Sequence, residues 1–353
     1  MVTVSGAAHG ILPRTTIQQL ATVLRMTFRS LDVFKLHSSC ASLPSAELST
    51  TVDPLLIEAC VCPACHGSLT WDAGLTTCVS CGRSYPVVDG IPVFAVLHGD
   101  DHKRGQAELR FDAPSANWEI ERPSGGAALY GWLMLYKLRR GVSGIESHIR
   151  GATVLVVCAG SGMDAEFLAR QGARVIASDV SLDAAMRTRE RARRHRIPLI
   201  PLVADAEALP FRDHGIELTF VHDGLHHLRD PTVGVREMAR VTADALSISE
   251  PAKALVTAIA IKAGIALVEE PAGNPVARLE LPQVKKVLQD SGLDVVAAER
   301  YAMFYRHEPG PAMRLLSRGR LQPLARHAIR LFNTTFGPVS NKLVVKAVRR
   351  QDH

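Results

Sequence analysis

The chain has few aromatic residues and no uninterrupted apolar run of membrane-spanning length. Aromatic side chains make up 5% of its 353 residues, so few are available to stack on nucleic-acid bases. The longest apolar stretch, residues 254–268, is interrupted by Lys262 and is shorter than the roughly 20 residues of a spanning helix. We therefore predict no transmembrane helix, and the chain length excludes a peptide hormone or a disulfide-stabilised miniprotein.

Acidic residues are scarce in two parts of the chain. Residues 301–353 hold ten Lys and Arg against two Asp and Glu, and residues 187–196 hold six Arg against one Glu. Such surfaces attract nucleic acid, anionic lipid or an acidic substrate, although a solvated helix face is the commoner cause. A hydrophobic content of 47% with 22% charged residues is typical of a globular protein.

The seven cysteines are an odd number, and four of them form two C-x2-C pairs. Cys62 and Cys65 make the first pair, and Cys78 and Cys81 make the second, twelve residues further on. Two turns at this spacing can present four thiolates to one tetrahedral Zn²⁺ at about 2.3 Å. The alternatives are two disulfides or an empty site, and Cys60 could compete as a ligand. With no signal-peptide pattern at the start, this cysteine usage indicates a reducing cytoplasm.

The residues around these cysteines carry a family resemblance. The run from Val52 through CPAC at 62–65 and CVSC at 78–81 into YPVVDGIPV at 85–93 resembles the small zinc-ribbon family whose eukaryotic members activate tRNA and release-factor methyltransferases. The resemblance implies a structural zinc and a module that packs beside a methyltransferase, with residues 85–93 as an apolar contact strand. We expect the ribbon to pack on a methyltransferase domain of its own chain.

Beyond residue 128, apolar runs alternate with helix-like segments. Strand-like runs occur at 154–157, 175–177, 199–203, 218–221, 246–248, 294–298 and 342–348. This alternation predicts an α/β fold with a doubly wound, mostly parallel, seven-stranded sheet. We expect a disordered or non-native extension (1–51), a zinc-ribbon domain (52–97), a linker (98–127) and the sheet domain (128–353).

The first predicted strand of the sheet domain runs into a glycine turn, Gly160-Ser161-Gly162, that opens a helix. Glycines let a backbone approach a ligand closely, and a helix N-terminus favours polar or anionic groups. Asp179, at the end of the second strand, can hold ribose hydroxyls. NAD and S-adenosylmethionine both need such a carboxylate, so an oxidoreductase and a methyltransferase both stay open on these residues alone.

The segments after the third and fourth strands separate these alternatives. They read ADAEALPF at 204–211 and HDGLHHL at 222–228. In this order and spacing, residues 128–300 resemble the class I S-adenosylmethionine-dependent methyltransferases of the type 11 group, which includes quinone-biosynthesis C-methyltransferases. The resemblance implies seven cofactor-binding residues: Ala159, Gly160 and Gly162 by backbone contact, Asp179 at the ribose, Asp205 and Ala206 at the adenine, and His222 beside the cofactor.

The chain departs from this family at two positions. Val156 stands where the family has an acidic residue, and Cys158 stands where it has a glycine. One anchor for the methionine ammonium is therefore missing, and the turn is more crowded. Water or another carboxylate, such as Asp164, could replace the anchor.

Methyl transfer is an in-line displacement at a sulfonium carbon, so it depends on positioning and a desolvated pocket and requires no metal. For a hydroxyl acceptor a general base helps. His226 and His227, just past the fourth strand, are the candidates, and Asp223 is the next. We place the acceptor pocket among residues 130–138, 250–274 and the basic, leucine-rich segment 306–330, which also suits an amphipathic helix on a membrane surface.

The sequence thus predicts a cytoplasmic S-adenosylmethionine-dependent methyltransferase that contains a structural Zn²⁺. Its acceptor is expected to be a small molecule, a glycan or a lipid-linked compound, methylated at oxygen or carbon. Two other functions stay open. One is an RNA methyltransferase that uses the basic surfaces, with affinity that falls steeply with salt. The other is a degenerate S-adenosylmethionine-binding or interaction module.

Overall fold

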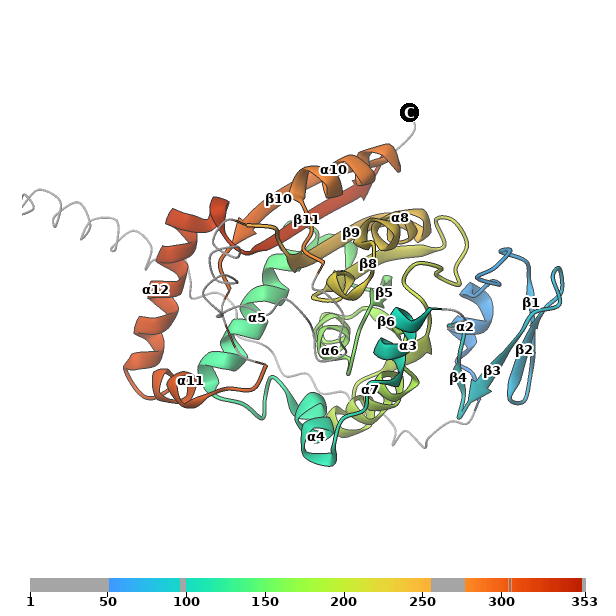
Figure 1. Cartoon of the computed structure of the whole chain (residues 1–353), viewed down its shortest axis with the longest axis horizontal. Coiled ribbons are helices and arrows are strands. Elements are labelled where there is room, and N and C mark those ends of the chain that lie inside the picture. Colours follow the sequence, from blue (N-terminus) through green and yellow to red (C-terminus); the bar gives the residue numbers. More distant parts are fainter. Residues whose placement is uncertain (1–50, 96–99, 255–276, 304, 306, 351–353) are drawn as a thin grey trace, which may run out of the picture. The chain divides into compact units, whose positions relative to one another are not determined.

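The structure, a computed structural model, describes residues 51–95, 100–254, 277–303, 305 and 307–350 (Figure 1). The predicted extension up to residue 50 and the middle of the predicted acceptor region, 255–276, lie outside the described residues. Within those described ranges no helix combines the length and apolar character that crossing a bilayer requires.

The cysteine-bearing module consists of one short helix and four antiparallel strands. Helix α2, Pro54–Ala59, begins where the Asp53 carboxylate accepts the Leu55 N–H at 2.9 Å. The strands β1 (Leu69–Asp72), β2 (Leu75–Cys78), β3 (Ser84–Val88) and β4 (Ile91–Pro92) pair in chain order. Asp89 and Gly90 join β3 to β4 with φ of 50° and 78°, the left-handed conformations that a tight hairpin turn favours.

The segment predicted as a linker, 98–127, contains two helices, α3 (Asp101–Glu108) and α4 (Ala113–Glu121). An aspartate caps each of them: Asp100 accepts the N–H groups of His102 and Lys103 at 3.1 Å, and Asp112 accepts that of Ser115 at 2.9 Å. Side-chain caps of this kind satisfy otherwise unpaired N–H groups of the first turn. The polar composition of this segment therefore reflects capped surface helices, and both pack on α7 (Leu182–His195).

The larger domain has the predicted seven-stranded sheet, in the order β10-β11-β9-β8-β5-β6-β7. The five strands from β9 to β7 pair in parallel, and β11 runs antiparallel to both β9 and β10. Its strands are β5 (Thr153–Val157), β6 (Arg174–Asp179), β7 (Leu199–Val203), β8 (Ile216–His222), β9 (Thr242–Pro251), β10 (Leu293–Tyr301) and β11 (Lys342–Arg349).

Helices cover both faces of this sheet. They are α5 (Ala128–Val142), α6 (Met163–Ala169), α7, α8 (Pro231–Val241), α10 (Leu281–Asp290), α11 (Pro311–Leu316) and α12 (Leu321–Phe336). All five side chains of β5 are buried, with Leu155 and Val157 in one apolar cluster and Val154 and Val156 in another. Successive strand residues point to opposite faces, so the continuous apolar run of β5 reflects a strand buried on both sides.

The strand order changes direction at β5, which pairs with β6 on one side and with β8 on the other. In an open parallel sheet, ligands bind in the crevice outside the carboxyl ends of the strands at such a switch point. The glycine turn after β5, Asp179 at the end of β6 and His222 at the end of β8 all lie at this edge of the sheet.

The small module and the sheet domain share backbone hydrogen bonds and a core. Val61 donates its N–H to the Pro210 carbonyl at 2.9 Å, and Phe94 donates to the Val203 carbonyl at the end of β7 at 2.8 Å. Leu56, Phe94 and Leu202 belong to one buried apolar cluster. This contact agrees with the expectation that the ribbon packs on its own sheet domain, with the segment after β4 as the contact strand.

Candidate functional site

The four cysteines of the two C-x2-C pairs lie together. Their Sγ atoms all fall within 4.8 Å of one another, with Cys62 and Cys78 buried and Cys65 and Cys81 exposed. Cys62 Sγ is 3.7 Å from Cys81 Sγ, and Cys65 Sγ is 3.5 Å from Cys78 Sγ. Disulfide sulfurs would be about 2.05 Å apart, whereas thiolates about 2.3 Å from a tetrahedral ion would be about 3.8 Å apart. The spacing therefore fits a metal and not two disulfides.

Neighbouring groups lower the pKa of Cys62 and Cys78, whereas they raise the pKa of Cys65. The Cys81 backbone N–H donates to Cys78 Sγ at 3.5 Å, and it lowers the pKa of Cys78 to about 6. The Tyr85 hydroxyl lies 3.2 Å from Cys62 Sγ, and the Tyr85 ring packs edge-on against Phe94 at 5.2 Å. Cys60 lies outside the cluster, and its backbone forms an isolated antiparallel β-bridge with Phe211 of the sheet domain. Tyr85 thus links the cysteine cluster to the core that the two domains share.

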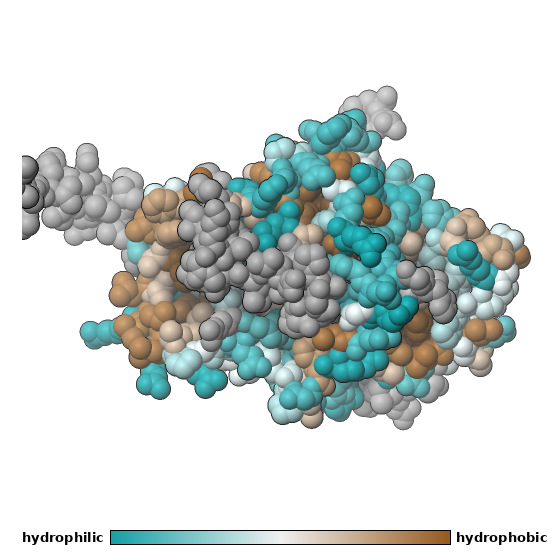
Figure 2. All heavy atoms as spheres, viewed as in Figure 1, coloured by the Kyte–Doolittle hydropathy of each residue, from teal (hydrophilic) through white to brown (hydrophobic). Residues whose placement is uncertain are grey.

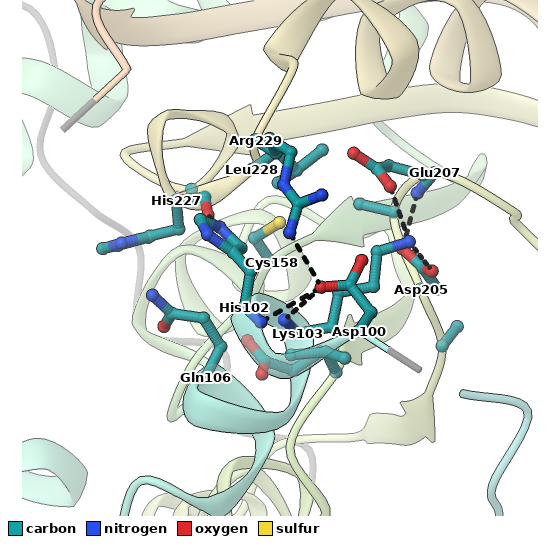
Figure 3. A pocket seen from close by; sticks show the side chains of 15 residues that line it. Asp100, His102, Lys103, Gln106, Cys158, Asp205, Glu207, His227, Leu228 and Arg229 are labelled. Atoms are coloured by element: carbon teal, nitrogen blue, oxygen red, sulfur yellow. Dashed lines mark hydrogen bonds and ion pairs between the residues drawn. The ribbon is translucent and has the colours of Figure 1, made fainter. Parts of the chain in front are cut away.

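A pocket with about 620 Å³ of empty space lies at the carboxyl edge of the sheet (Figure 3). Cys158, Asp179, Asp205, Ala206 and Gly224 line it from the sheet domain, and α3 lines its opposite side. The pocket brings together three of the predicted cofactor-binding residues, namely Asp179, Asp205 and Ala206.

Asp179 lines this pocket and holds the glycine turn beside it. The Asp179 carboxylate accepts the N–H groups of Gly160 at 2.9 Å and Ser181 at 3.0 Å, and its burial raises the pKa of Asp179. Gly160 has φ of 55°, and a Cβ built on it would meet no atom within 4 Å. Gly162 has φ of 76° and begins α6, where a Cβ would lie 3.0 Å from Thr188 Oγ1. The turn therefore leaves open space at Gly160 and close packing at Gly162.

Asp205 lines the pocket from the sheet side and pairs with α3 on the opposite side. Asp205 accepts the Glu207 N–H at 2.9 Å and pairs with Lys103 Nζ at 2.5 Å, while Lys103 also pairs with Glu207 at 2.5 Å (Figure 3). Lys103 lies in the segment predicted as a linker, so its pairing with Asp205 and Glu207 was not predicted from the sequence. The ammonium group of Lys103 pairs with the Asp205 Oδ2 atom, which would otherwise face the pocket.

The two departures from the family pattern have structural counterparts. Val156 is fully buried in the core below the turn. Cys158 adopts φ of 54°, a left-handed conformation that is strained for a residue with a side chain. A Cβ at residue 224 would lie 2.3 Å from Cys158 Cβ, so Gly224 provides the space that Cys158 fills. Gly224 thus leaves room for the Cys158 side chain, and both residues line the pocket.

Asp164 lies in the first turn of α6, close behind the glycine turn. It is buried, and burial raises the pKa of Asp164 to about 7. The described residues offer it backbone N–H contacts and the longer-range charges of Arg122 and Arg191. A buried carboxylate of this kind can take a proton or a ligand cation near neutral pH.

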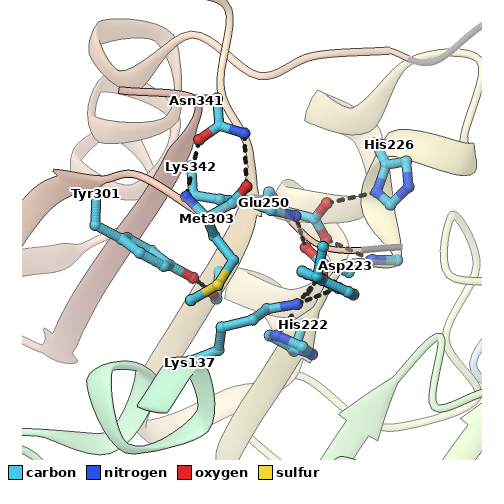
Figure 4. Close-up of polar contacts among 12 residues, drawn as sticks. Lys137, His222, Asp223, His226, Glu250, Tyr301, Met303, Asn341 and Lys342 are labelled. Atoms are coloured by element: carbon cyan, nitrogen blue, oxygen red, sulfur yellow. Dashed lines mark hydrogen bonds and ion pairs between the residues drawn. The ribbon is translucent and has the colours of Figure 1, made fainter. Parts of the chain in front are cut away.

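His226, His227 and Glu250 meet where β8 and β9 end (Figure 4). Buried Glu250 accepts the N–H groups of Gly224 and Leu225, both at 2.7 Å, and lies 2.9 Å from His226 Nδ1. A carboxylate in this position orients an imidazole for proton transfer. The His227 side chain lines the nucleotide pocket instead, and burial lowers the pKa of His227 to about 3. His226 thus pairs with Glu250 and His227 lines the pocket, while the two rings pack together with their centroids 4.1 Å apart.

Asp223 is the centre of a buried charge cluster (Figure 4). Lys137 Nζ from α5 lies 2.5 Å from Asp223 Oδ2, Lys342 from β11 pairs with Oδ1, and the Tyr305 hydroxyl lies 3.1 Å from Oδ2. Burial would raise the pKa of Asp223, but the two lysines hold it well below its ordinary value. Lys137 is fully buried, and burial lowers the pKa of Lys137. Sequence reasoning missed both lysines.

His222, at the end of β8, is buried beside this cluster, and burial lowers the pKa of His222 well below its ordinary value. Its Nε2 atom is buried without a hydrogen-bond partner among the described residues. A buried polar atom without a partner is costly unless a ligand or water satisfies it. Ala159 is buried in the turn, where its N–H is bonded to the Ser178 carbonyl at 2.9 Å.

The arginine run 187–196 lies on α7 and is largely neutralised within the chain. Five of its six arginines pair with carboxylates at Asp89, Glu121, Glu166, Asp183 and Glu190. Arg191 is fully buried and also donates to the Ser161 carbonyl at 2.6 Å. These arginines support the glycine turn and α4 more than they form an open basic surface.

Comparison with known proteins assigns both parts of the chain. Residues 155–245 match the family model described as a methyltransferase domain, and residues 53–90 match that of Trm112p-like proteins. The chain is 42% identical over 93 residues to a demethylmenaquinone methyltransferase of Corynebacterium urealyticum, which covers 26% of this chain and 37% of that protein. A protein of the same name from Renibacterium salmoninarum is 35% identical over 105 residues, covering 30% of this chain and 42% of that protein.

The chain thus spans about two fifths of the length of these curated relatives. Among solved structures, magnesium protoporphyrin IX methyltransferase from Synechocystis is similar with a TM-score of 0.49 and 15% sequence identity, covering 71% of this chain and all of that one. The sequence matches agree with the glycine turn, the switch-point pocket and the cysteine cluster described above. Residues 155–245 therefore resemble a methyltransferase domain, and a Trm112p-like segment at residues 53–90 precedes them.

Proposed function

We propose that the chain is an S-adenosylmethionine-dependent methyltransferase acting on a small or lipid-linked acceptor that bears an acidic hydroxyl group. The observation that carries the proposal is the switch-point pocket, where Asp179 and Asp205 line the carboxyl edge of the sheet, α3 lines the opposite side, and the glycine turn is bonded to Asp179. Adenosine requires such an arrangement, with a carboxylate for the ribose hydroxyls and an acceptor for the adenine amino group.

The residues present fit the cofactor at both ends. Asp179 would accept the ribose hydroxyls while its backbone bonds keep it in place, and Asp205 with the Ala206 N–H would meet the adenine edge. Asp164 would face the ammonium group that Val156 cannot hold, and the unpartnered Nε2 of His222 would point to a polar group of the ligand. Bound S-adenosylmethionine supplies an electrophilic methyl group on a positively charged sulfur.

The four cysteines would hold a structural Zn²⁺. A closed four-cysteine site has no open coordination position, so in this proposal the metal stabilises the ribbon and takes no part in methyl transfer. The ribbon contributes to the methyltransferase domain through Val61, Tyr85 and Phe94, which connect the cysteine cluster to β7.

The residues past β8 and β9 would act on the acceptor. Glu250 orients His226, which would remove a proton from the acceptor hydroxyl. Lys137 and Lys342 place two buried cations on the single carboxylate of Asp223. The surplus positive charge favours an acceptor that develops negative charge on oxygen, such as a phenol or an enol. In this proposal Asp223 positions the lysines and is not the base.

The competing functions make different demands on the structure. An RNA methyltransferase needs an open basic surface, and the arginines of α7 are mostly paired within the chain, which leaves the exposed arginines around α11 as its candidate surface. A degenerate module is suggested by Val156 and Cys158, but Gly224 restores the space that Cys158 takes. Both alternatives predict no methyl transfer to a small acceptor.

A transfer assay with methyl-labelled S-adenosylmethionine tests the proposal. Demethylmenaquinol is the first acceptor to try because the matched relatives carry that name, and simple phenols and bulk tRNA are tested beside it. We expect label in a phenolic or quinol acceptor, lost in Asp179→Ala and kept in Asp244→Asn, a carboxylate at the amino end of β9. Label in tRNA alone, or in no acceptor at all, would refute the proposal.

A further inference from the structure

Helices α11 and α12 expose a continuous row of large apolar side chains. Leu315 and Leu324 are 54% and 65% exposed, and Leu331 and Phe332 are 53% and 45% exposed. The Phe332 and Phe336 rings pack together at 4.9 Å on the same side. We call this surface the outer face; it comprises Leu315, Leu316, Leu321, Leu324, Leu331, Phe332 and Phe336. Figure 2 shows apolar residues gathered over these two helices.

The inner side of α12 holds the helix in this orientation. The Asn333 side chain accepts the Ala302 N–H at 2.5 Å and donates to the Ala302 carbonyl at 3.2 Å. Arg326 and Arg330 lie over the Trp132 ring of α5 at 5.5 and 5.4 Å from its centroid. An ordinary surface helix turns its apolar stripe to the core, whereas α12 packs inward through Ile329, Asn333 and the two arginines and leaves most of its large apolar side chains outside. The two hydrogen bonds of Asn333 hold α12 in this orientation, with its large apolar side chains facing outward.

The charge around the outer face has one sign. The sequence contains no Asp or Glu between Glu308 and Asp352. Arg314, Arg318 and Arg320 are exposed beside Leu315 and Leu316. Two copies of this chain would bring these arginines against each other without an acidic partner, so self-association through this face is unfavourable. An apolar face flanked by arginines instead matches the acidic headgroups and acyl chains of an anionic membrane surface.

We propose that the outer face of α11–α12 binds the chain to the surface of an anionic phospholipid bilayer. Both helices pack on α5, which carries Lys137 of the buried charge cluster, and the chain between β10 and α11 carries Tyr305 of the same cluster. Membrane binding through α11–α12 thus brings the acceptor side of the site to the lipid. The inference deepens the proposed function, because it identifies the acceptor as one carried in a membrane.

Vesicle co-sedimentation of the full zinc-loaded chain tests this inference. Vesicles of pure phosphatidylcholine are compared with vesicles that contain phosphatidylglycerol, at low and high salt. We expect at least tenfold stronger partitioning to the anionic vesicles, reduced by salt because the arginines are screened. Equal partitioning to both vesicle types, or none, would overturn the inference.

Substitutions locate the binding surface. We expect Leu324→Gln with Leu331→Gln to reduce partitioning at least tenfold, and Arg318→Gln with Arg320→Gln to remove the preference for anionic lipid. Val296→Gln is the matched control, because Val296 is 52% exposed on β10, away from α12, and it should bind as the unmodified chain does. Equal losses in the control and the Leu variant would refute the assignment.

Two further measurements keep the outcomes separate. If light scattering shows a dimer that the Leu324→Gln variant converts to a monomer, the outer face is a self-association surface and the inference is wrong. Calorimetry with S-adenosylhomocysteine on the same samples reports on the nucleotide pocket alone. Vesicle binding without nucleotide binding would leave the membrane surface standing while contradicting the proposed function, and the reverse result would contradict only the membrane surface.

Discussion

The cysteine cluster and the nucleotide pocket are built by opposite means. The cluster uses four side chains of one type within 20 consecutive residues, 62–81, and its supporting module shares a core with the sheet domain. The pocket uses backbone turns, small residues and single carboxylates from segments between residues 100 and 229. A side-chain site fails when one ligand is lost, whereas a backbone site tolerates substitutions, such as Cys158 with Gly224, that preserve its shape.

The largest effect should come from removing the metal. Structural Zn²⁺ contributes about 10–16 kcal/mol in comparable small modules, so Cys78→Ser should lose zinc and unfold the ribbon. The sheet domain should be destabilised as well, because it loses the contacts of Leu56 and Phe94 with its core. Zinc content by mass spectrometry and the Tm by calorimetry measure this. Cys60→Ala, a buried thiol outside the cluster, should keep its zinc; full zinc and an unchanged Tm in Cys78→Ser would contradict the account.

The two adjacent histidines sharpen the comparison within the sheet domain. General-base catalysis contributes about 10²- to 10⁴-fold, so His226→Ala should lower kcat by about that factor with S-adenosylhomocysteine affinity unchanged. His227→Gln, which alters a lining residue of the nucleotide pocket, should change ligand affinity more than kcat. Steady-state kinetics on the transfer assay separate the two. A larger kcat loss in His227→Gln than in His226→Ala would reverse our assignment.

The ammonium end of the pocket should respond to pH. Burial raises the pKa of Asp164 to about 7, and a ligand ammonium favours the ionised form, so binding below pH 7 requires Asp164 to release a proton. Affinity for S-adenosylhomocysteine should therefore fall up to about tenfold per unit below pH 7 and level off above pH 8. Calorimetry in buffers of different ionisation enthalpy measures the number of protons that are released when the ligand binds. Asp164→Asn should abolish the pH dependence, and an unchanged profile in that variant would assign the proton elsewhere.

The smallest expected effect concerns the ion pair on the adenine side. Lys103 pairs with Asp205 and Glu207 at the rim of the pocket, where such pairs contribute about 0.2–1 kcal/mol. Lys103→Gln frees the Asp205 oxygen and should tighten S-adenosylhomocysteine binding up to about fivefold. Arg104, the next residue of α3, pairs with Asp101 alone among the described residues, and Arg104→Gln is the control. Weaker binding in Lys103→Gln would show that Lys103 contacts the ligand.

The sequence predicted the elements that local patterns determine. The C-x2-C spacing placed the cysteine cluster, and the alternation of apolar runs with helical segments predicted the seven-stranded sheet. The linker prediction was wrong for 101–121, because Asp100 and Asp112 cap helices whose composition is polar. The turn and cap residues can be read from the sequence, but whether they begin a helix depends on what that helix packs against.

The charged residues around Asp223 could not be predicted in the same way. Lys137 and Lys342 are 86 and 119 residues away from Asp223 in the chain, and only the sheet order brings them together. Each of them also stands among apolar residues in the sequence, where a single lysine is normally interpreted as a surface residue. A buried cation in a strand or helix face that is otherwise apolar is the one signal that could have identified them.

Calorimetric titration of the zinc-loaded chain with S-adenosylhomocysteine, in parallel with Asp179→Ala, Asp244→Asn and an NAD titration, tests the central claim most directly. The account predicts 1:1 binding of S-adenosylhomocysteine and none of NAD. Hydrogen bonds to a charged group contribute about 1.5–3 kcal/mol, so Asp179→Ala should weaken binding about 10- to 150-fold while Asp244→Asn binds normally. Absence of S-adenosylhomocysteine binding, or equal binding by Asp179→Ala, would contradict the assignment of the pocket.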